Sequence, residues 1–416
     1  MKVLLIGSGA REHALAWKLA ASPTLDRLLI LPGNPGMARL GDTIEGVSPV
    51  EVGAVAAVAA AHSVDLAVIG PEAPLAAGVS DALRRAGVAV FGPSRSGARL
   101  ESSKSFAKEV MARAGVPTAG STTFSDPGTA HAHLQSADGP YVVKADGLAA
   151  GKGVLVTEAR EEAADWVDAC FEGRFGEAGS TVVIEEYLEG PELSVFAICD
   201  GTRHVVLEPA RDYKRLADGD AGPNTGGMGS YSPVDVPADL LSAVARTVIE
   251  PTIATMADDG DPYIGFLYVG LALTADGPKV IEFNCRLGDP ETQVVLPRLE
   301  SDLLSVLEAA ANGDLGDTRL EWSPHAAVNV VLASSGYPTD PVSGAAITGL
   351  DDVDDDVLVF HAGTRAEGRH LVTSGGRVLS VVGSGPDLPA ARSSAYEAVD
   401  RIRFRGMQFR TDIAAG

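Results

Sequence analysis

The segment from residue 280 to residue 293 carries an unusual number of groups that can do chemistry. It begins as an apolar strand, yet Glu282, Asn284 and Arg286 occupy alternate positions in it. Because successive side chains of a strand point to opposite faces, these three are predicted to share one face. A pair of converging oxygen ligands suits Mg²⁺, which takes its other ligands from water and phosphates. The alternative is a solvated strand end in which Arg286 pairs with Asp289.

A second group of chemically useful residues lies in the segment from residue 141 to residue 154. Lys144 lies at the end of a predicted strand rich in β-branched residues. A glycine-rich loop that contains Lys152 follows, and a second strand begins after it. This spacing differs from that of a P-loop, in which Gly-Lys is followed by Ser or Thr at a helix start. It predicts a hairpin whose glycine tip covers phosphates that the lysines neutralise, whereas a plain β-turn needs no lysine.

Acidic side chains follow the strand that begins at residue 181. Glu185 and Glu186 stand at its end, and Glu192 precedes the next strand. Carboxylates at a strand end are often only solvated. They can also accept hydrogen bonds from an adenine amino group and from ribose hydroxyls.

The elements that must position these residues begin with a doubly wound α/β domain. Apolar strands at residues 2–6, 28–31, 66–69 and 88–91 each end in a loop rich in glycine or proline. The first loop, Gly7-Ser8-Gly9, precedes a helix from Ala14, and so places backbone N–H groups where an anion can bind. The glycines can equally serve only to make the turn. Ligands of such folds bind at the carboxyl edge of the parallel sheet.

Length and composition exclude several classes of protein. A chain of 416 residues with 45% hydrophobic residues is globular and long enough for two to four domains. Its net charge of −23 argues against sequence-independent nucleic-acid binding, which needs a basic surface. The spacing of its three cysteines predicts neither a disulfide framework nor a zinc site, and Cys285 is expected in the core. No membrane span or cleavable signal is apparent, so we expect a cytoplasmic protein.

The charged residues suggest adaptation to salt. Only eight of the 33 basic residues are lysines. Four of these fall in motifs that could bind phosphate or substrate, namely Lys104, Lys144, Lys152 and Lys214. We hypothesise that the acidic surface repels itself in dilute buffer and is screened at high ionic strength.

The order of these motifs resembles that of the ATP-grasp ligases, and the finer match is to the glycinamide ribonucleotide synthetase family. Residues 7–14, 70–75, 222–229, 284–293 and 360–364 carry this resemblance, which covers nearly the whole chain. The fold that it implies is an α/β domain at residues 1–101 and an ATP-grasp domain at 102–325, with a mobile lid at about 120–190. A C-terminal α+β domain follows at 326–416.

The resemblance implies a binding site for ATP. By match to the family, Lys104 and Lys144 contact the phosphates, Glu185, Glu186 and Leu188 line the adenine, and Glu192 contacts the ribose. The lid hairpin contains Gly147, Gly151, Lys152 and Gly153. Glu282 and Asn284 hold Mg²⁺ or Mn²⁺ between the β- and γ-phosphates.

The resemblance also implies the substrates glycine and 5-phosphoribosylamine, joined through glycyl phosphate by a monomer. The expected catalytic residues are Arg286, Asp212 and Lys214. Arg286 is chosen because a guanidinium pairs well with phosphoryl oxygens. The residues expected to contact the substrates are Gly9, Arg11, Glu12, Glu72, Asn224, Thr225, Gly226, Gly227, Asp289 and Glu291.

The chain departs from the family pattern at three places. Arg211 stands where the family usually has Gln, and Pro191 stands where it often has Glu, so that Glu192 becomes the expected ribose contact. The strand from residue 265 to residue 273 carries no acid, which puts a fully protein-ligated second metal in doubt. His361 is expected to be structural or to bracket the site, with a catalytic role as the alternative.

Two other functions compete with this one. The first is a different ATP-grasp ligase, which the segment 224–229 argues against. The second is a regulatory protein that binds nucleotide without catalysis, which would need neither the lysines nor Arg286.

Overall fold

The N-terminal part of the chain is a parallel sheet with helices on both sides. The computed structural model describes residues 1–149 and 153–415. The sheet has the strand order β3-β2-β1-β4-β5, and its strands are almost continuously apolar because both faces are covered. The short strand β3 was not predicted. The elements are β1 (Lys2–Gly7), α1 (Ala10–Ala20), β2 (Arg27–Pro32), η1 (Met37–Arg39), β3 (Asp42–Thr43), α2 (Val52–His62), β4 (Leu66–Ile69), α3 (Glu72–Ala77), α4 (Val79–Arg85) and β5 (Ala89–Phe91).

A small antiparallel sheet follows and has a core of its own. Its strand order is β6-β9-β7-β8, and Lys144 pairs with Val154 across the predicted hairpin. Val143, Val167 and Ile184 are among the apolar side chains buried between this sheet and its helices. Two helices, α5 (Arg99–Ser102) and α6 (Lys104–Ala114), lead into the sheet. Its elements are β6 (Ser121–Phe124), α7 (Pro127–Ser136), β7 (Tyr141–Ala145), β8 (Val154–Thr157), α8 (Arg160–Phe171), η2 (Gly176–Gly179) and β9 (Val182–Glu186).

The central sheet is antiparallel, with the strand order β11-β10-β16-β17. A register shift lies opposite Gly270 and Leu271, so that Ile281 has no partner in the neighbouring strand. Such a bulge re-aims the residues that follow it. Val280 and Phe283 consequently pack into the same core although they are three residues apart. The strands are β10 (Glu192–Asp200), β11 (His204–Val206), β16 (Ile264–Thr274) and β17 (Gly277–Asn284).

One long helix packs beside the central sheet. It runs through α9 (Leu240–Val244), η4 (Ala245–Ile249) and α10 (Glu250–Asp258). Among the described residues it is the only helix long and apolar enough to cross a membrane by length and composition alone. Val244, Val248 and Ile253 lie in the same hydrophobic cluster as Val269 and Phe283. The helix is therefore part of the core of this domain.

The C-terminal sheet takes two of its strands from the middle of the sequence. In the order β12-β15-β18-β23-β20, β15 pairs with β18 and so joins residues 229–232 to the C-terminal region. A hairpin, β13 (Arg215–Ala217) with β14 (Ala221–Asn224) around η3 (Asp218–Asp220), projects between β12 and β15. The other strands and the last helix are β12 (Arg211–Asp212), β15 (Gly229–Ser232), β18 (Ala326–Ala333), β20 (Leu358–His361), β23 (Arg377–Gly385) and α13 (Leu388–Val399).

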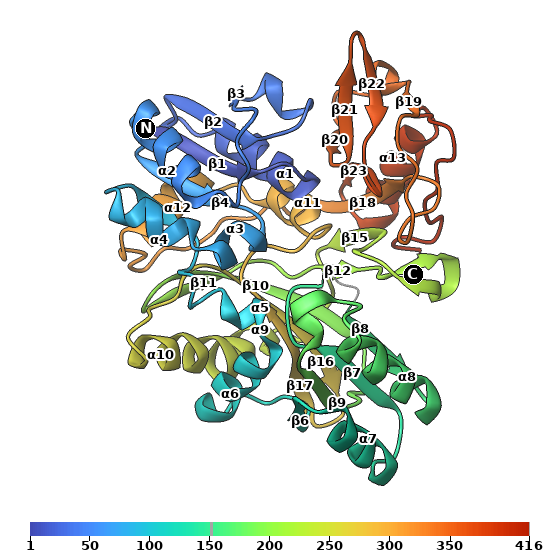
Figure 1. The fold of residues 1–416 in the computed structure, drawn as a ribbon. Helices are drawn as coiled ribbons and strands as arrows, with labels where there is room; N and C mark the ends of the chain where they lie inside the picture. The colour runs from blue at the N-terminus through green and yellow to red at the C-terminus, as the bar shows by residue number, and fades with distance from the viewer. Residues whose placement is uncertain (150–152, 416) are drawn as a thin grey trace.

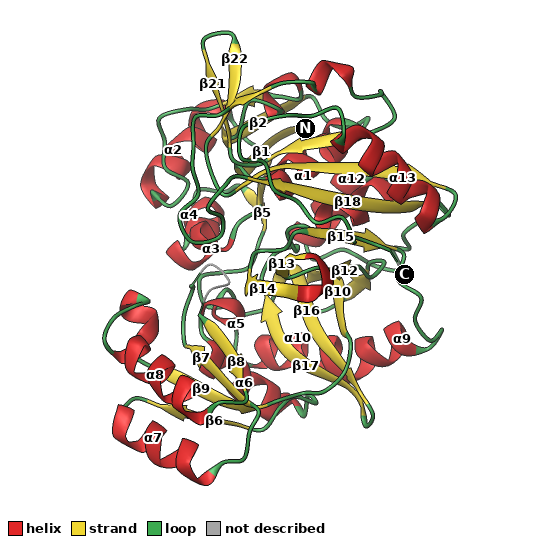
Figure 2. Ribbon diagram, turned by 90° about the vertical axis from the view of Figure 1, so that its right-hand side faces the viewer, coloured by secondary structure: helices red, strands yellow, loops and turns green. Residues whose placement is uncertain are grey.

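Four further helical segments and a second C-terminal sheet complete the described part of the fold. The chain from β17 to β18 forms α11 (Thr292–Val295), η5 (Leu296–Arg298) and α12 (Leu303–Ala311). The second sheet contains β19 (Ala346–Ile347), β21 (Thr364–Glu367) and β22 (His370–Thr373), and η6 (Leu350–Asp352) follows β19. Figures 1 and 2 show the N- and C-terminal sheets together at one end of the molecule and the small sheet at the other.

Two neutral histidines join the N- and C-terminal sheets. The backbone N–H of His361 donates to Nδ1 of His13 at 2.8 Å, and the ring centroids are 5.6 Å apart. Burial lowers the pKa of His13 to about 3, with a further lowering by His361. Burial, and then Arg39, lowers the pKa of His361 to about 4. This favours the structural interpretation of His361.

This contact predicts a loss of stability in mild acid. A histidine whose pKa is depressed by folding stabilises the protein above its unfolded pKa of about 6.5, and that stability is lost as the pH falls toward the folded pKa. For His13 we expect a loss of about 1 kcal/mol between pH 7.5 and pH 5.5. Melting curves should show a smaller fall in the His13→Gln variant than in wild type or in His370→Gln, which changes an exposed histidine. Equal falls in all three would contradict the assignment.

Candidate active site at the end of the central sheet

The predicted oxygen pair lies at the end of β17. Nδ2 of Asn284 donates to Oε1 of Glu282 at 3.3 Å, so both side chains are on one face of the sheet. Although burial raises the pKa of Glu282, Lys144 and Lys214 lower it below its usual value. The carboxylate is therefore anionic, as a ligand for a hard cation should be. No group of three or more His, Cys, Asp or Glu side chains that could hold a metal is present among the described residues.

Arg286 is held by two carboxylates from other elements. Its Nη2 lies 2.9 Å from Oε1 of Glu101 and its Nε lies 3.3 Å from Oε2 of Glu72. Nη2 also donates to Asn284 Oδ1 at 3.4 Å, which places the guanidinium beside the oxygen pair. The alternative prediction, that Arg286 pairs with Asp289, is wrong. Asp289 pairs with Arg377 instead.

Glu101 is a site residue that sequence reasoning missed. Besides Arg286, its carboxylate accepts hydrogen bonds from the backbone N–H of Cys285 at 2.9 Å and from Sγ of Cys285 at 3.1 Å. Cys285 is buried in the hydrophobic core, as predicted. No local sequence pattern predicts a role for Glu101, because its partners are more than 180 positions away in the sequence.

The lysines form a second layer of the site, around Glu185. Lys144 Nζ donates to Glu185 Oε2 at 3.0 Å and to the carbonyl of Ile281 at 3.1 Å, and thereby joins the small sheet to β17. Lys108, which was not predicted, lies 3.2 Å from the same carboxylate oxygen. Oε1 of Glu185 is buried and has no partner among the described residues, so it is available to a ligand.

The other residues predicted to bind nucleotide surround this layer. Lys104 Nζ donates to the carbonyl of Gly147 at 2.9 Å, and burial lowers its pKa. Glu186 is exposed and accepts from Gly120 N–H at 3.1 Å, and Leu188 is half-buried. Gly153 follows the gap in the described residues, whereas Gly151 and Lys152 lie outside them.

Lys214 lies between two carboxylates. It contacts Glu192 and is 3.3 Å from Asp212 Oδ1. Burial lowers the pKa of Lys214, but Asp212 and its other neighbours raise it well above the usual value. Burial raises the pKa of Asp212. Glu192, predicted to contact ribose, is thus already engaged by a residue predicted to be catalytic.

The loop after Lys214 is braced by Thr225. The backbone N–H and Oγ1 of Thr225 both donate to the Lys214 carbonyl, at 2.8 and 2.9 Å, and Gly227 N–H donates to Oγ1 at 3.0 Å. Asn224 is exposed and pairs with Arg215 in the hairpin. Of the loop residues predicted to contact substrate, Thr225 therefore has its hydroxyl in use.

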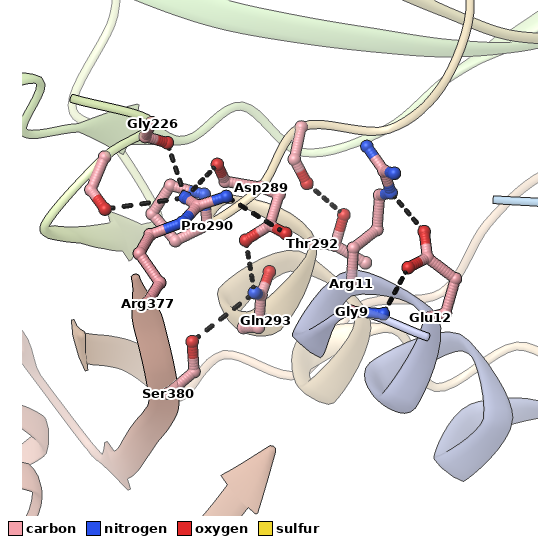
Figure 3. Close-up of polar contacts among 12 residues, drawn as sticks. Gly9, Arg11, Glu12, Gly226, Asp289, Pro290, Thr292, Gln293, Arg377 and Ser380 are labelled. Atoms are coloured by element: carbon pink, nitrogen blue, oxygen red, sulfur yellow. Dashed lines mark hydrogen bonds and ion pairs between the residues drawn. The ribbon is translucent and has the colours of Figure 1, made fainter. Parts of the chain in front are cut away.

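The turn from Gly288 to Gln293 is fixed by the C-terminal sheet (Figure 3). Nη1 of Arg377 donates to the carbonyls of Gly226 at 2.5 Å and of Asp289 at 2.7 Å. Nη2 of Arg377 lies 3.3 Å from Asp289 Oδ2, and Gln293 donates to Asp289 Oδ1 at 2.9 Å. Arg377 was not predicted, because its sequence context is that of an ordinary strand start.

The glycine turn of the N-terminal sheet is supported by Glu12. One carboxylate oxygen accepts from Gly9 N–H at 2.8 Å and the other from Arg11 Nε. Arg11 also donates to the carbonyl of Leu287 at 3.3 Å. Both side chains are buried, and a Cβ on Gly7 or Gly70 would clash with Glu12. Of the predicted contacts in this turn, Gly9 is the more accessible to a ligand.

A cavity of about 410 Å³ opens between the N- and C-terminal sheets. Its cation is Arg377 and its carboxylate is Asp289. Asn34 fixes the two walls together by donating to the carbonyls of Ser8 and His361, both at 2.8 Å. The remaining lining residues are Ser8, Gly9, Gly33, Ala362, Gly363, Thr364 and Ser374.

A parallel N-terminal sheet, a lysine-bearing hairpin on a small sheet, and an oxygen pair on an antiparallel central sheet define an ATP-grasp ligase. The biotin carboxylase of Campylobacter jejuni shares this fold, with a TM-score of 0.74 at 16% identity over 98% of this chain and 92% of that one. The chain belongs to the phosphoribosylglycinamide synthetase family. The N domain, the ATP-grasp (A) domain and the C domain of that family match residues 1–101, 102–292 and 327–416.

Individual relatives match over their whole length. A phosphoribosylamine–glycine ligase of Streptomyces coelicolor is 52% identical over 421 residues, covering 100% of this chain and 99% of that protein. One from Ralstonia nicotianae is 50% identical over 416 residues, covering 99% and 98%. The crystal structure of the Thermotoga maritima ligase superposes with a TM-score of 0.87 at 36% identity, covering 99% of this chain and 100% of that one.

Proposed function

We propose that this chain joins glycine to 5-phosphoribosylamine at the expense of ATP, in de novo purine biosynthesis. The products are glycinamide ribonucleotide, ADP and phosphate. The observation that carries the proposal is one site in which an anionic Glu282, Asn284 and Arg286 adjoin three lysines, in a chain whose full-length relatives bear the name of this ligase.

The chemistry follows from the need to make a carboxylate oxygen a leaving group. Glycine attacks the γ-phosphate of ATP to form glycyl phosphate, and the amine of phosphoribosylamine then displaces phosphate. Phosphoryl transfer depends mainly on positioning and on charge neutralisation. Lys104 and Lys144 neutralise the nucleotide phosphates, and Arg286 stabilises charge on the transferring group. Asp212 and Lys214, which pair with each other, complete the group of catalytic residues.

The remaining nucleotide contacts are made to adenine, to ribose and to the phosphates. Glu185, through its free Oε1, and the backbone near Glu186 and Leu188 bind adenine, and the hairpin flanked by Gly147 and Gly153 covers the phosphates. Glu192 binds ribose after it exchanges its contact with Lys214 for the ligand.

Mg²⁺ or Mn²⁺ fits the donor set of this site. Glu282 and Asn284 supply one anionic and one neutral oxygen, which are ligand types that hard cations prefer. When bound, the ion neutralises the phosphates from which the γ-phosphoryl group departs. With only two side-chain ligands in this strand, most of the coordination shell is left to phosphates and water.

The phosphoribosyl group fits the cavity between the N- and C-terminal sheets. Arg377 and the hydroxyls of Ser8, Thr364 and Ser374 suit a phosphate. Asp289 suits a ribose hydroxyl. This placement keeps Gly9, Gly226 and Gly227 near the substrate, while Arg11, Glu12 and Thr225 support the walls.

Two competing functions are less favoured. Another ATP-grasp ligase of purine metabolism would have to use the same nucleotide site with a different acceptor. A non-catalytic nucleotide sensor would gain nothing from a guanidinium held between Glu72 and Glu101 beside the oxygen pair.

The deciding experiment is a coupled assay of ADP release with glycine, ATP, Mg²⁺ and phosphoribosylamine generated in situ. ADP release should require both glycine and the amine. Equal release without the amine, or replacement of glycine by another amino acid, would refute the assignment.

Arg286→Ala should lower kcat by a factor of about 100 or more, because it removes a charge-stabilising donor from the transition state. Binding of ATP should change little, as measured by the thermal shift that ATP produces. Arg113→Ala, which removes an exposed arginine, is the control. Unchanged turnover in Arg286→Ala would exclude this residue from the mechanism.

Arg377→Gln should raise the KM for phosphoribosylamine about tenfold or more, since a charged hydrogen bond to phosphate contributes about 1.5–3 kcal/mol. The KM for ATP should stay within about twofold of wild type. Arg365→Gln in the neighbouring exposed strand β21 is the matched control. An unchanged KM for phosphoribosylamine would place the phosphate elsewhere, and a uniform effect on both substrates would mean that Arg377 acts only by holding the turn at Asp289.

We further propose that the protein acts as a monomer in the cytoplasm, independently of nucleic acid and membranes, and that its acidic surface is adapted to salt. The net charge of −23 supports both the exclusion of nucleic acid and the salt dependence. The melting temperature should rise with KCl as repulsion is screened. A flat or falling melting temperature would remove the salt hypothesis.

A further inference from the structure

Glu291 is a buried carboxylate in the turn after β17, and in the described part of the chain only one of its oxygens accepts a hydrogen bond from another residue. Glu291 is only 3% exposed, and its Oε1 accepts a hydrogen bond from Ser194 Oγ at 3.1 Å. Ser194 Oγ in turn lies 2.9 Å from the hydroxyl of Tyr268. Among the described residues, no other residue donates a hydrogen bond to Oε2 of Glu291, and the backbone N–H of Glu291 itself is a further donor to the carboxylate. The carboxylate is thus oriented by Ser194 through Oε1, while Oε2 lies beside Gly288 with no donor from another described residue.

This network shares a sheet face with the predicted metal ligands. In the central sheet Ser194 lies opposite Gly270, which lies opposite Glu282. Tyr268 lies opposite Asn284 in the same sheet. Since directly opposed residues point to the same face, the hydroxyls of Ser194 and Tyr268 lie on the face that carries Glu282 and Asn284. Glu291 approaches that face from the turn after β17.

Glu282 and Glu291 have opposite electrostatic environments. Lysines lower the pKa of Glu282 despite its burial. Burial, followed by repulsion from Asp212, raises the pKa of Glu291 to about 7, although Lys214 and Arg286 act in the opposite direction. Tyr268 is the other titratable group that faces it. Carboxylates with divergent pKa values in one site commonly divide charge stabilisation and proton transfer between them.

We propose that Glu291 is the group that accepts the proton lost by the amine of phosphoribosylamine, and that Ser194 and Tyr268 position it. This inference rests on the proposed function. As the amine nitrogen bonds to the carbonyl carbon of glycyl phosphate, the bond from that carbon to the phosphate oxygen breaks. Phosphate leaves with the electron pair, and the ammonium proton passes to Oε2 of Glu291.

The test separates formation of glycyl phosphate from its use. Hydroxylamine attacks acyl phosphates without enzymatic help, so glycine hydroxamate reports the first half-reaction alone. In Glu291→Gln, ligation to phosphoribosylamine should fall by a factor of about 100 to 10,000, while hydroxamate formation stays within about threefold of wild type. Glu300→Gln, an exposed acid on the following segment, is the control and should match wild type in both assays.

A parallel loss of both activities in Glu291→Gln, or no loss in either, would overturn the assignment of Glu291. If wild-type enzyme forms neither hydroxamate nor ligation product, the proposed function itself fails. Melting curves of each variant establish that it is folded. Glu291→Asp, which keeps the carboxylate, should recover part of the ligation rate if Glu291→Gln is unstable.

The positioning role has its own readout. Wild-type ligation should increase with pH as Glu291 loses its proton near pH 7. A hydrogen bond donated to a carboxylate favours its charged form, so Ser194→Ala should move the acid limb of the ligation profile to higher pH. The hydroxamate profile should not move. An unchanged ligation profile in Ser194→Ala would overturn the role of Ser194.

Discussion

The fixation of one turn, from Gly288 to Gln293, is the constraint on which the rest of the site depends. The carbonyl of Pro290 accepts hydrogen bonds from Ser230 Oγ at 2.7 Å and from Asn329 Nδ2 at 3.2 Å, both fully buried. Arg377 holds Asp289 in the same turn. Buried polar groups are costly unless they are paired, so this turn has little freedom to adopt another position. It therefore fixes how β17 meets the C-terminal sheet.

As a consequence, the residues before the turn and those after it face different parts of the site. Upstream, Glu282, Asn284 and Arg286 lie beside the lysines of the proposed nucleotide site. Downstream, Asp289 faces the cavity between the terminal sheets, and Glu291 faces Asp212 and Lys214. Under the proposed function, this one short segment would contact both of the substrates that react with each other. The bulge at Ile281 contributes, because it turns the oxygen pair away from the hydrophobic core.

Much of this architecture follows from local sequence pattern. Apolar runs that end in a glycine- or proline-rich loop predicted four of the five parallel strands, and strand alternation predicted that Glu282 and Asn284 share a face. The lysine hairpin was likewise predicted as β7 and β8. What local pattern could not supply was the pairing of distant charges. Glu101, Lys108 and Arg377 have ordinary sequence neighbours, and only the tertiary fold brings them to Arg286, Glu185 and Asp289. The placement of β12 and β15 in the C-terminal sheet is equally a long-range result.

The central claim is that glycine becomes an acyl phosphate before it meets the amine. Transfer of ¹⁸O from the carboxylate of labelled glycine tests this directly, because glycyl phosphate carries a glycine oxygen to the phosphate that leaves. Mass spectrometry of the inorganic phosphate from a complete reaction should show one ¹⁸O atom for each ligation event. Phosphate that contains no label would contradict the account, since the carboxylate oxygen would then never have been bonded to phosphorus.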